Sequence, residues 1–95
     1  MYGTIFKLNI KDGHHEALLK EISQDNSLPT GMKAWFIMKP DQQKEWIGVA
    51  IFESKETYVA NAESPEQHEQ FLKIMQHLES EPSWTDGEFV FGQIN

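Results

Sequence analysis

The sequence contains no cysteine. This absence excludes disulfides, thiolate zinc sites and a cysteine nucleophile, and it favours a reducing compartment, so we expect a cytoplasmic protein. No apolar run approaches the ~18 residues of a membrane span, and polar residues interrupt the N-terminal segment where a signal peptide is continuously apolar. A Gly-rich phosphate loop and a Gly-x-Ser-x-Gly element are also missing, so nucleotide binding and serine-hydrolase chemistry have no support.

Positive charge is scarce as well. The chain carries 8 Lys and Arg against 15 Asp and Glu, a formal net charge of −7 at pH 7, and its basic residues do not cluster. Nucleic acid and anionic membrane surfaces are therefore not expected partners. With 95 residues, of which 39% are hydrophobic, the chain forms one globular domain over residues 1–95.

Alternating apolar residues predict four strands. In the first strand Tyr2, Thr4, Phe6, Leu8 and Ile10 share one face, and the strand at 45–53 is apolar on both faces. We expect Asp86-Gly87 to turn the chain before the last strand, with Trp84 in that turn closing one end of the fold. The predicted strands are 2–10, 32–39, 45–53 and 88–94.

Helical spacing and capping residues predict the intervening helices. The first covers 14–24 and is followed by a loop over 25–31. Ser54 begins a short helix that ends near Ala62. Ser64, with Pro65 next to it and Gln67 three positions later, begins a longer helix that ends before Pro82. Its apolar stripe is predicted to contain Phe71, Leu72, Met75 and Leu78.

The order β-α-β-β-α-β is typical of a ferredoxin-like α+β fold, an antiparallel sheet with helices on one face. Helices shield only one face, so the apolar residues on both faces of 32–39 and 45–53 predict a homodimer joined sheet to sheet. Trp46 and Phe52 share a face by parity, but parity does not say which.

Several segments carry a family resemblance. They are Met1-Tyr2-Gly3-Thr4-Ile5, the Lys11-Asp12-Gly13 turn, and the stretches 52–58, 60–67 and 81–88. With these the chain resembles the antibiotic biosynthesis monooxygenase-like branch of the dimeric α+β barrel superfamily along essentially its whole length. The motifs are structural rather than catalytic.

The resemblance implies a pocket between the helices and the sheet of each subunit, and a barrel formed by two sheets. It also implies a small-molecule substrate and, for some relatives, oxidation of aromatic or quinol compounds by dioxygen without a cofactor. The Asn, Trp and His of haem-degrading relatives align with Phe6, Asn61 and Phe71. None of the three matches, which speaks against haem degradation.

His68 is the leading candidate base. It precedes Phe71 by three residues and Met75 by seven, so we expect it on the apolar side of its helix, where it could accept a proton from a phenol. The alternative is a core or boundary histidine bonded to the backbone.

Tyr58 and Asn61 follow the third strand and could position a substrate oxygen at the pocket rim. Alternatively, Tyr58 packs by its ring and Asn61 caps or turns the chain. The side chains expected to line the pocket are Phe6, Trp35, Phe52, Phe71 and Met75.

A metal site is not expected. His15 lies on the apolar side of its helix, but at the opposite end of the sheet from His68. Leu19 and Leu72 stand where a zincin motif needs its second histidine. His14 and His77 are predicted to be exposed.

The leading functional hypothesis is a cofactor-independent monooxygenase acting on a small aromatic or quinol-type substrate. His68 would be the base, with Tyr58 or Asn61 positioning an oxygen atom. The alternatives are a non-catalytic small-molecule-binding or stress-associated protein of the same fold, and an isomerase or dehydratase that uses the same base.

Overall fold

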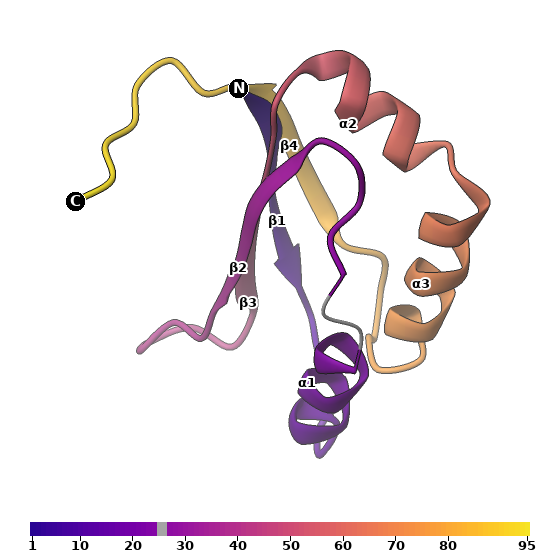
Figure 1. Ribbon diagram of the computed structural model, residues 1–95. Helices are drawn as coiled ribbons and strands as arrows, with labels where there is room; N and C mark the ends of the chain where they lie inside the picture. Colours follow the sequence, from indigo (N-terminus) through magenta and orange to yellow (C-terminus); the bar gives the residue numbers. More distant parts are fainter. Residues whose placement is uncertain (25–26) are drawn as a thin grey trace.

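The computed structural model describes residues 1–24 and 27–95 of the chain (Figure 1). The elements run in the order βαββααβ. The four strands are β1 (Tyr2–Leu8), β2 (Met32–Met38), β3 (Trp46–Phe52) and β4 (Ser83–Glu88). The three helices are α1 (His15–Ser23), α2 (Lys55–Ala62) and α3 (Pro65–Met75).

The strands form one antiparallel sheet in the order β2-β3-β1-β4. Figure 1 shows the helices on one side of this sheet and the other side open. The ferredoxin-like α+β fold predicted from the sequence is therefore confirmed.

The core lies between the sheet and the helices, and it settles which face of β3 is internal. Trp46, Ala50 and Phe52 are buried, while Val49 and its neighbours of the same parity are half-buried on the open face. The Phe6 ring packs so closely on Gly48 that a Cβ at that position would overlap it. The buried apolar residues are Phe6, Leu8, Ile10, Leu18, Trp46, Ala50, Phe52 and Leu78.

The expected parity of the second strand is wrong at its start. The pairing with β3 shifts between Met32 and Ala34, as at a β-bulge. Because the extra residue moves Met32 to the other face, it packs against the core together with Trp35 and Ile37.

The prediction for the last strand is also wrong. β4 covers Ser83–Glu88, so Asp86 and Gly87 pair with β1 instead of turning the chain. Trp84 accordingly lies within a strand, on the face that carries Phe6, at 5.0 Å between ring centroids. Residues 89–95 follow the sheet as a segment without regular structure, whose end points away from the domain in Figure 1.

α3 ends at Met75, earlier than expected, so Leu78 lies outside the helix whose stripe it was predicted to join. The remaining boundaries differ little from the expected ones. The first strand ends at Leu8 rather than Ile10, which instead forms an isolated bridge to Leu78. The loop predicted over 25–31 has no helix or strand in residues 27–31. Its first two residues, Asp25 and Asn26, lie outside the described residues.

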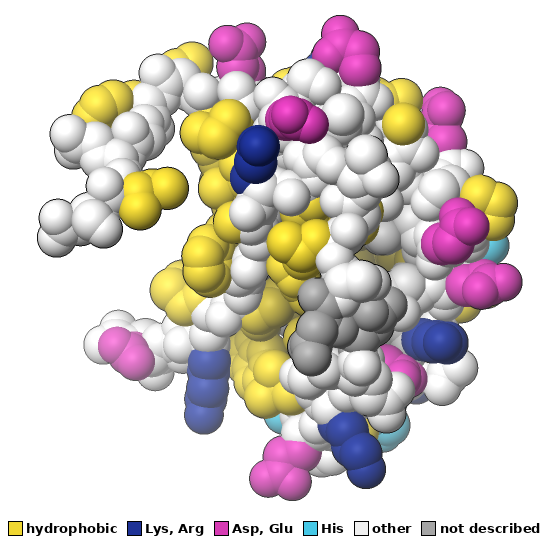
Figure 2. Space-filling model, viewed as in Figure 1, with side chains coloured by type: hydrophobic (Ala, Val, Ile, Leu, Met, Phe, Trp, Pro, Cys, Tyr) yellow, Lys and Arg dark blue, Asp and Glu magenta, His cyan; other side chains and the backbone are white. Residues whose placement is uncertain are grey.

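The open face of the sheet is apolar. Phe36 is 64% exposed, and Figure 2 shows hydrophobic side chains along the sheet between the C-terminal segment and the β2–β3 hairpin. The C-terminal segment itself exposes Val90, Phe91 and Ile94. We refer below to one set of residues as the open-face patch: Ile5, Phe36, Met38, Ile47, Val49 and Ile51.

Candidate functional site

Capping residues fix where α2 begins. The Ser54 hydroxyl accepts a hydrogen bond from the Thr57 amide (3.2 Å), and the Ser54 amide donates to the Thr57 hydroxyl (3.3 Å). This reciprocal pair satisfies amides that would otherwise lack partners at the helix start. None of the residues of α2 is fully buried, so its caps and a few side chains hold it in place. One of these side chains is that of Tyr58, which follows Thr57 and reaches from α2 to the sheet.

The Tyr58 ring packs at the end of the sheet where β1 begins and β3 ends. Its centroid lies 5.4 Å from the ring of Tyr2 and 5.4 Å from that of Phe52, which it meets edge to face. Both distances fall in the favourable range for aromatic pairs. The phenol is thereby held beneath α2 with its hydroxyl directed to β4.

The Tyr58 hydroxyl donates a hydrogen bond of 2.9 Å to Asp86 Oδ1. Burial, and after it the hydrogen bond to Asp86, raise the pKa of Tyr58 to about 12, while the hydroxyl of Thr4 opposes the shift. Thr4 is buried, and its hydroxyl donates to the Thr85 carbonyl at 3.2 Å. At neutral pH Tyr58 is therefore a phenol that donates, beside a carboxylate that accepts.

The structure brings together some of the predicted pocket residues. Phe6 and Phe52 belong to the buried core, and Trp35 and Met75 pack against it. Phe71 is half-buried on α3. Among these residues, Phe52 contacts the Tyr58 ring edge to face.

The expected orientation of His68 is wrong. Its side chain is exposed. Leu72 is 52% exposed, so it does not belong to the half-buried stripe of α3. The centre of that stripe is therefore about one residue further from His68 than the sequence predicts. The half-buried positions of this helix are Gln67, Gln70, Phe71, Ile74 and Met75.

Asn61 lies at the junction of α2 and α3. Its side-chain amide nitrogen, Nδ2, donates to Gln67 Oε1 at 3.5 Å, and its backbone carbonyl oxygen accepts from the Ser64 hydroxyl at 2.9 Å. These contacts match the alternative in which Asn61 turns the chain. A part in substrate positioning stays a prediction.

Tyr58, Asp86 and Thr4 form the Tyr58 cluster. The sequence did not predict Asp86 or Thr4 as site residues. Asp86 was assigned to a turn because Asp-Gly is a common turn pair, although here both residues are in β4. Thr4 shares a face with Phe6 and Leu8 in the predicted first strand. A polar residue on this otherwise apolar face was the one feature of the sequence that could have indicated its place in the site.

His14 and His77 are half-buried, contrary to expectation. Their Nδ1 atoms lie 3.2 Å apart, a distance at which one imidazole donates to the other. His77 Nε2 also approaches Glu21 Oε1 at 3.7 Å. The contact joins the start of α1 to the segment after α3. Within residues 1–24 and 27–95, no three His, Asp or Glu side chains are placed to hold a metal ion.

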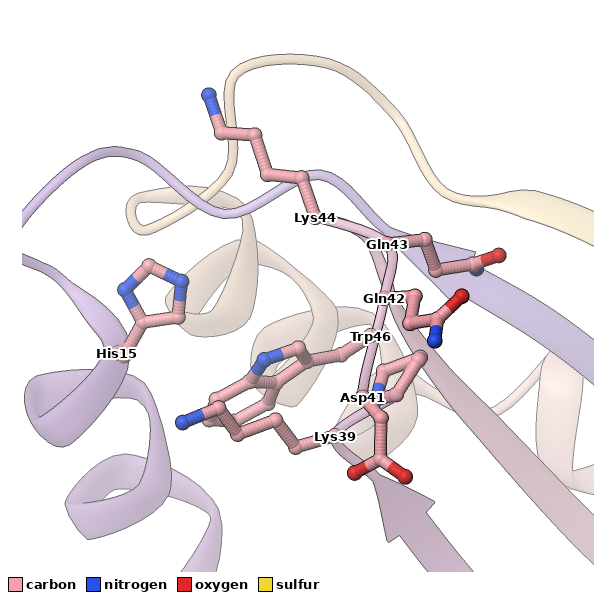
Figure 3. Close-up of a pocket in the computed structure, with 8 residues that line it drawn as sticks. His15, Lys39, Asp41, Gln42, Gln43, Lys44 and Trp46 are labelled. Carbon is pink, nitrogen blue, oxygen red and sulfur yellow. The ribbon is translucent and has the colours of Figure 1, made fainter.

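A separate cavity of about 500 Å³ lies between the start of α1 and the β2–β3 hairpin (Figure 3). Trp46 is buried at its base, and its ring centroid lies 5.1 Å from that of His15. The lining residues are His15, Lys39, Pro40, Asp41, Gln42, Gln43, Lys44 and Trp46.

The fold and the Tyr58 cluster define a helix-covered antiparallel sheet with an aromatic and polar site at one end. Among solved structures, the fold is shared by a candidate antibiotic biosynthesis monooxygenase from Nitrosomonas europaea, with a TM-score of 0.79 and 12% identity over 96% of this chain and 100% of that one. One from Bordetella bronchiseptica has a TM-score of 0.80 and 12% identity, over 95% and 97%.

A third similar structure is a variant of MhuD with two manganese protoporphyrin IX molecules bound per active site. Its TM-score is 0.79 and its identity 16%, over all of both chains. No family model and no curated protein matches the sequence. The chain therefore has the fold of the antibiotic biosynthesis monooxygenase-like proteins, as the resemblance implied. No helix in the described parts of the chain is long and apolar enough to cross a membrane.

Proposed function

We propose that the protein is a cofactor-independent monooxygenase that oxidises a small aromatic or quinol-type molecule. The observation that carries this proposal is the Tyr58–Asp86 hydrogen bond beside the rings of Tyr2 and Phe52. The half-buried rings of Tyr2 and Tyr58 offer an aromatic surface to a planar substrate, and the Tyr58 hydroxyl and Asp86 carboxylate can bond to its oxygen-bearing groups. The fold shared with candidate monooxygenases adds to this support.

In this proposal the substrate supplies all the electrons. A phenol with a ring CH₂ group loses a proton, and the resulting carbanion passes electrons directly to dioxygen. The CH₂ carbon becomes a carbonyl, one oxygen atom stays in the product and the other leaves as water. The balance of four electrons closes without an external reductant.

Tyr58 and Asp86 have distinct parts in this reaction. Because the pKa of Tyr58 is raised to about 12, its hydroxyl keeps its proton. When the substrate binds, this O–H turns from Asp86 to the substrate oxygen and stabilises negative charge there by hydrogen bonding. Asp86 orients the Tyr58 side chain through their hydrogen bond, and its carboxylate is close enough to Tyr58 to accept a proton from a substrate bound there. Asn61 lies three residues further along α2 and is the second candidate for positioning.

His68 as the base remains a prediction that its exposure does not favour, because a base works best where the substrate is desolvated. Haem is not proposed as a ligand, since Phe6, Asn61 and Phe71 occupy the positions that differ from haem-degrading relatives.

We further propose that two copies associate through the open-face patch. This patch exposes large apolar side chains, including Ile5 at 47% and Phe36 at 64%. Such a surface is costly in water and typical of an interface. The second copy is the favoured occupant because its patch is apolar in the same way, so a two-fold arrangement buries both at once.

The test is oxygen uptake with a panel of quinols and tricyclic phenols bearing a CH₂ group. Tyr58→Phe is expected to lower the uptake rate about 10²-fold, the usual effect of removing one donor to a developing oxyanion. Tyr2→Phe is the matched control, since it keeps the neighbouring ring and loses a hydroxyl that does not bond to Asp86.

Equal rates in wild type and Tyr58→Phe would remove Tyr58 from the reaction. Binding without any uptake would favour the non-catalytic alternative. Uptake that persists in His68→Ala would exclude His68 as the base.

A further inference from the structure

The cavity between α1 and the β2–β3 hairpin is separate from the Tyr58 cluster. Trp46, at its base, is the first residue of β3, and Phe52, beside Tyr58, is the last. Phe52 is six positions after Trp46 along the extended strand, which places them roughly 20 Å apart at about 3.3 Å per residue. The two sites therefore lie at opposite ends of the sheet.

The base of the cavity holds an unused hydrogen-bond donor. Trp46 is 6% exposed, yet its indole N–H has no hydrogen-bond acceptor among the described residues. Every fully buried side-chain nitrogen or oxygen in the described part of the chain has a hydrogen-bond partner. The Trp46 N–H has none among these residues, so it must be accessible to solvent. Buried tryptophans usually bond through this group. In Figure 3 the indole nitrogen lies on the edge of the ring nearest His15.

Two further donors border the same space. Lys39 forms no ion pair with any residue that the structure describes, whereas Lys44 pairs with Asp12 at 3.6 Å. The half-buried His15 imidazole contacts the Trp46 ring and makes no hydrogen bond to the described residues. In Figure 3 the Lys39 side chain extends alongside Trp46, and the Asp41 carboxylate points away from His15.

We infer that this cavity binds a small aromatic carboxylate. A planar ring packs against the half-buried His15 imidazole and the exposed edge of Trp46, and the carboxylate accepts from the Trp46 N–H and the Lys39 ammonium. The volume of about 500 Å³ suits a ligand of one or two rings, within the ordinary range of ligand pockets. An anion is the favoured charge although the chain as a whole carries −7, because Lys39 lines the cavity and forms no ion pair with a described carboxylate.

The experiment is an NMR titration of the three indole N–H signals with benzoate, followed on the intact protein. Benzoate is expected to shift the Trp46 signal and to leave those of Trp35 and Trp84 in place. Benzamide, which has the same ring and no charge, is expected to bind at least about threefold more weakly.

Lys39→Gln removes the charge and shortens the side chain by one atom, and it is expected to weaken benzoate binding roughly three- to tenfold. Lys33→Gln, the same change at a lysine within β2, is the matched control and is expected to bind as the wild type does. Both positions are exposed, so neither change threatens the fold.

Three results would overturn the inference: no Trp46 shift at millimolar benzoate, equal affinity for benzoate and benzamide, or equal affinity in Lys39→Gln and wild type. The titration involves no oxygen. Unchanged benzoate binding in Tyr58→Phe would show that this site is independent of the proposed monooxygenase site.

Discussion

Tyr58 joins three elements through one side chain. It leaves the first turn of α2, packs its ring against β1 and β3, and gives its proton to a hydrogen bond with Asp86 on β4. The raised pKa follows from burial and from a carboxylate acceptor, which both disfavour the phenolate. A group of this kind can donate at neutral pH but cannot serve as the base.

Spectrophotometric titration tests the state of this phenol. The chain has two tyrosines, so Tyr2→Phe leaves Tyr58 as the only source of tyrosinate absorption. We expect that absorption to appear near pH 12, and Asp86→Asn to move it to lower pH because the carboxylate acceptor is lost. A midpoint near the ordinary value of 10.0 in the folded Tyr2→Phe protein would contradict the buried, hydrogen-bonded phenol.

The same shift links Tyr58 to stability. Its pKa is higher in the folded chain, so the unfolded chain loses this proton first as the pH rises. The contribution of Tyr58 to the free energy of unfolding is complete below pH 10.0 and is lost between there and about 12. Tyr58→Phe should therefore show a smaller decline over that interval than wild type, when both are unfolded with urea at each pH.

At the scale of elements, the strands and helices that follow clear periodicity were predictable, and the errors have physical causes. Residues 89–94 alternate like a strand but have no neighbouring strand to pair with in a single chain. β4 is polar because it lies at the edge of the sheet, which is why its composition did not reveal it.

His68 was expected on the apolar side of α3 because it precedes Phe71 by three residues and Met75 by seven. Phe71 and Met75 are half-buried, but Gln67, Gln70 and Ile74 are half-buried too, so the buried face is centred further from His68, which is exposed. Periodicity predicts that a helix is amphipathic, but the centre of its buried face depends on neighbours that the sequence does not identify. Tyr58 could be predicted as a site residue from the sequence, but its partner Asp86 could not, because their contact joins α2 to a strand 28 positions later in the chain.

The capping residues of α2 should matter more than those of a well-buried helix. Ser54→Ala removes the acceptor for the Thr57 amide and should lower the free energy of unfolding by about 1 kcal/mol. Hydrogen exchange should show α2 losing more protection than α1. Ser23→Ala, at an exposed position, is the control and should change stability by less than about 0.5 kcal/mol. Equal effects of the two changes would contradict the importance of this cap.

At the scale of the whole molecule, the two faces of the sheet differ in what covers them. Helices cover one face, where both candidate sites lie, while no described residue outside the sheet covers the open-face patch. A net charge of −7 keeps copies apart over most of the surface, so association is favoured where apolar area is continuous. The exposed C-terminal residues Val90 and Phe91 extend the apolar surface available to a partner.

Sedimentation equilibrium tests this proposed association. We expect a dimer at micromolar concentration, and a shift toward monomer in Phe36→Lys, which places a charge in the open-face patch. Leu72→Lys is the matched control, because Leu72 is a similarly exposed apolar residue on the helical side. A wild-type monomer at micromolar concentration, or equal dissociation of both variants, would contradict association through this face.

The most direct test of the proposed oxygenation is the fate of isotopically labelled dioxygen. The protein, freed of metal by chelation and supplied with a tricyclic phenol but no reductant, should give a product with one labelled oxygen atom and release the other as labelled water. Tyr58→Phe should reduce the rate of label incorporation about 10²-fold. An unlabelled product, or hydrogen peroxide formed in equal amount to the oxygen consumed, would contradict a monooxygenase.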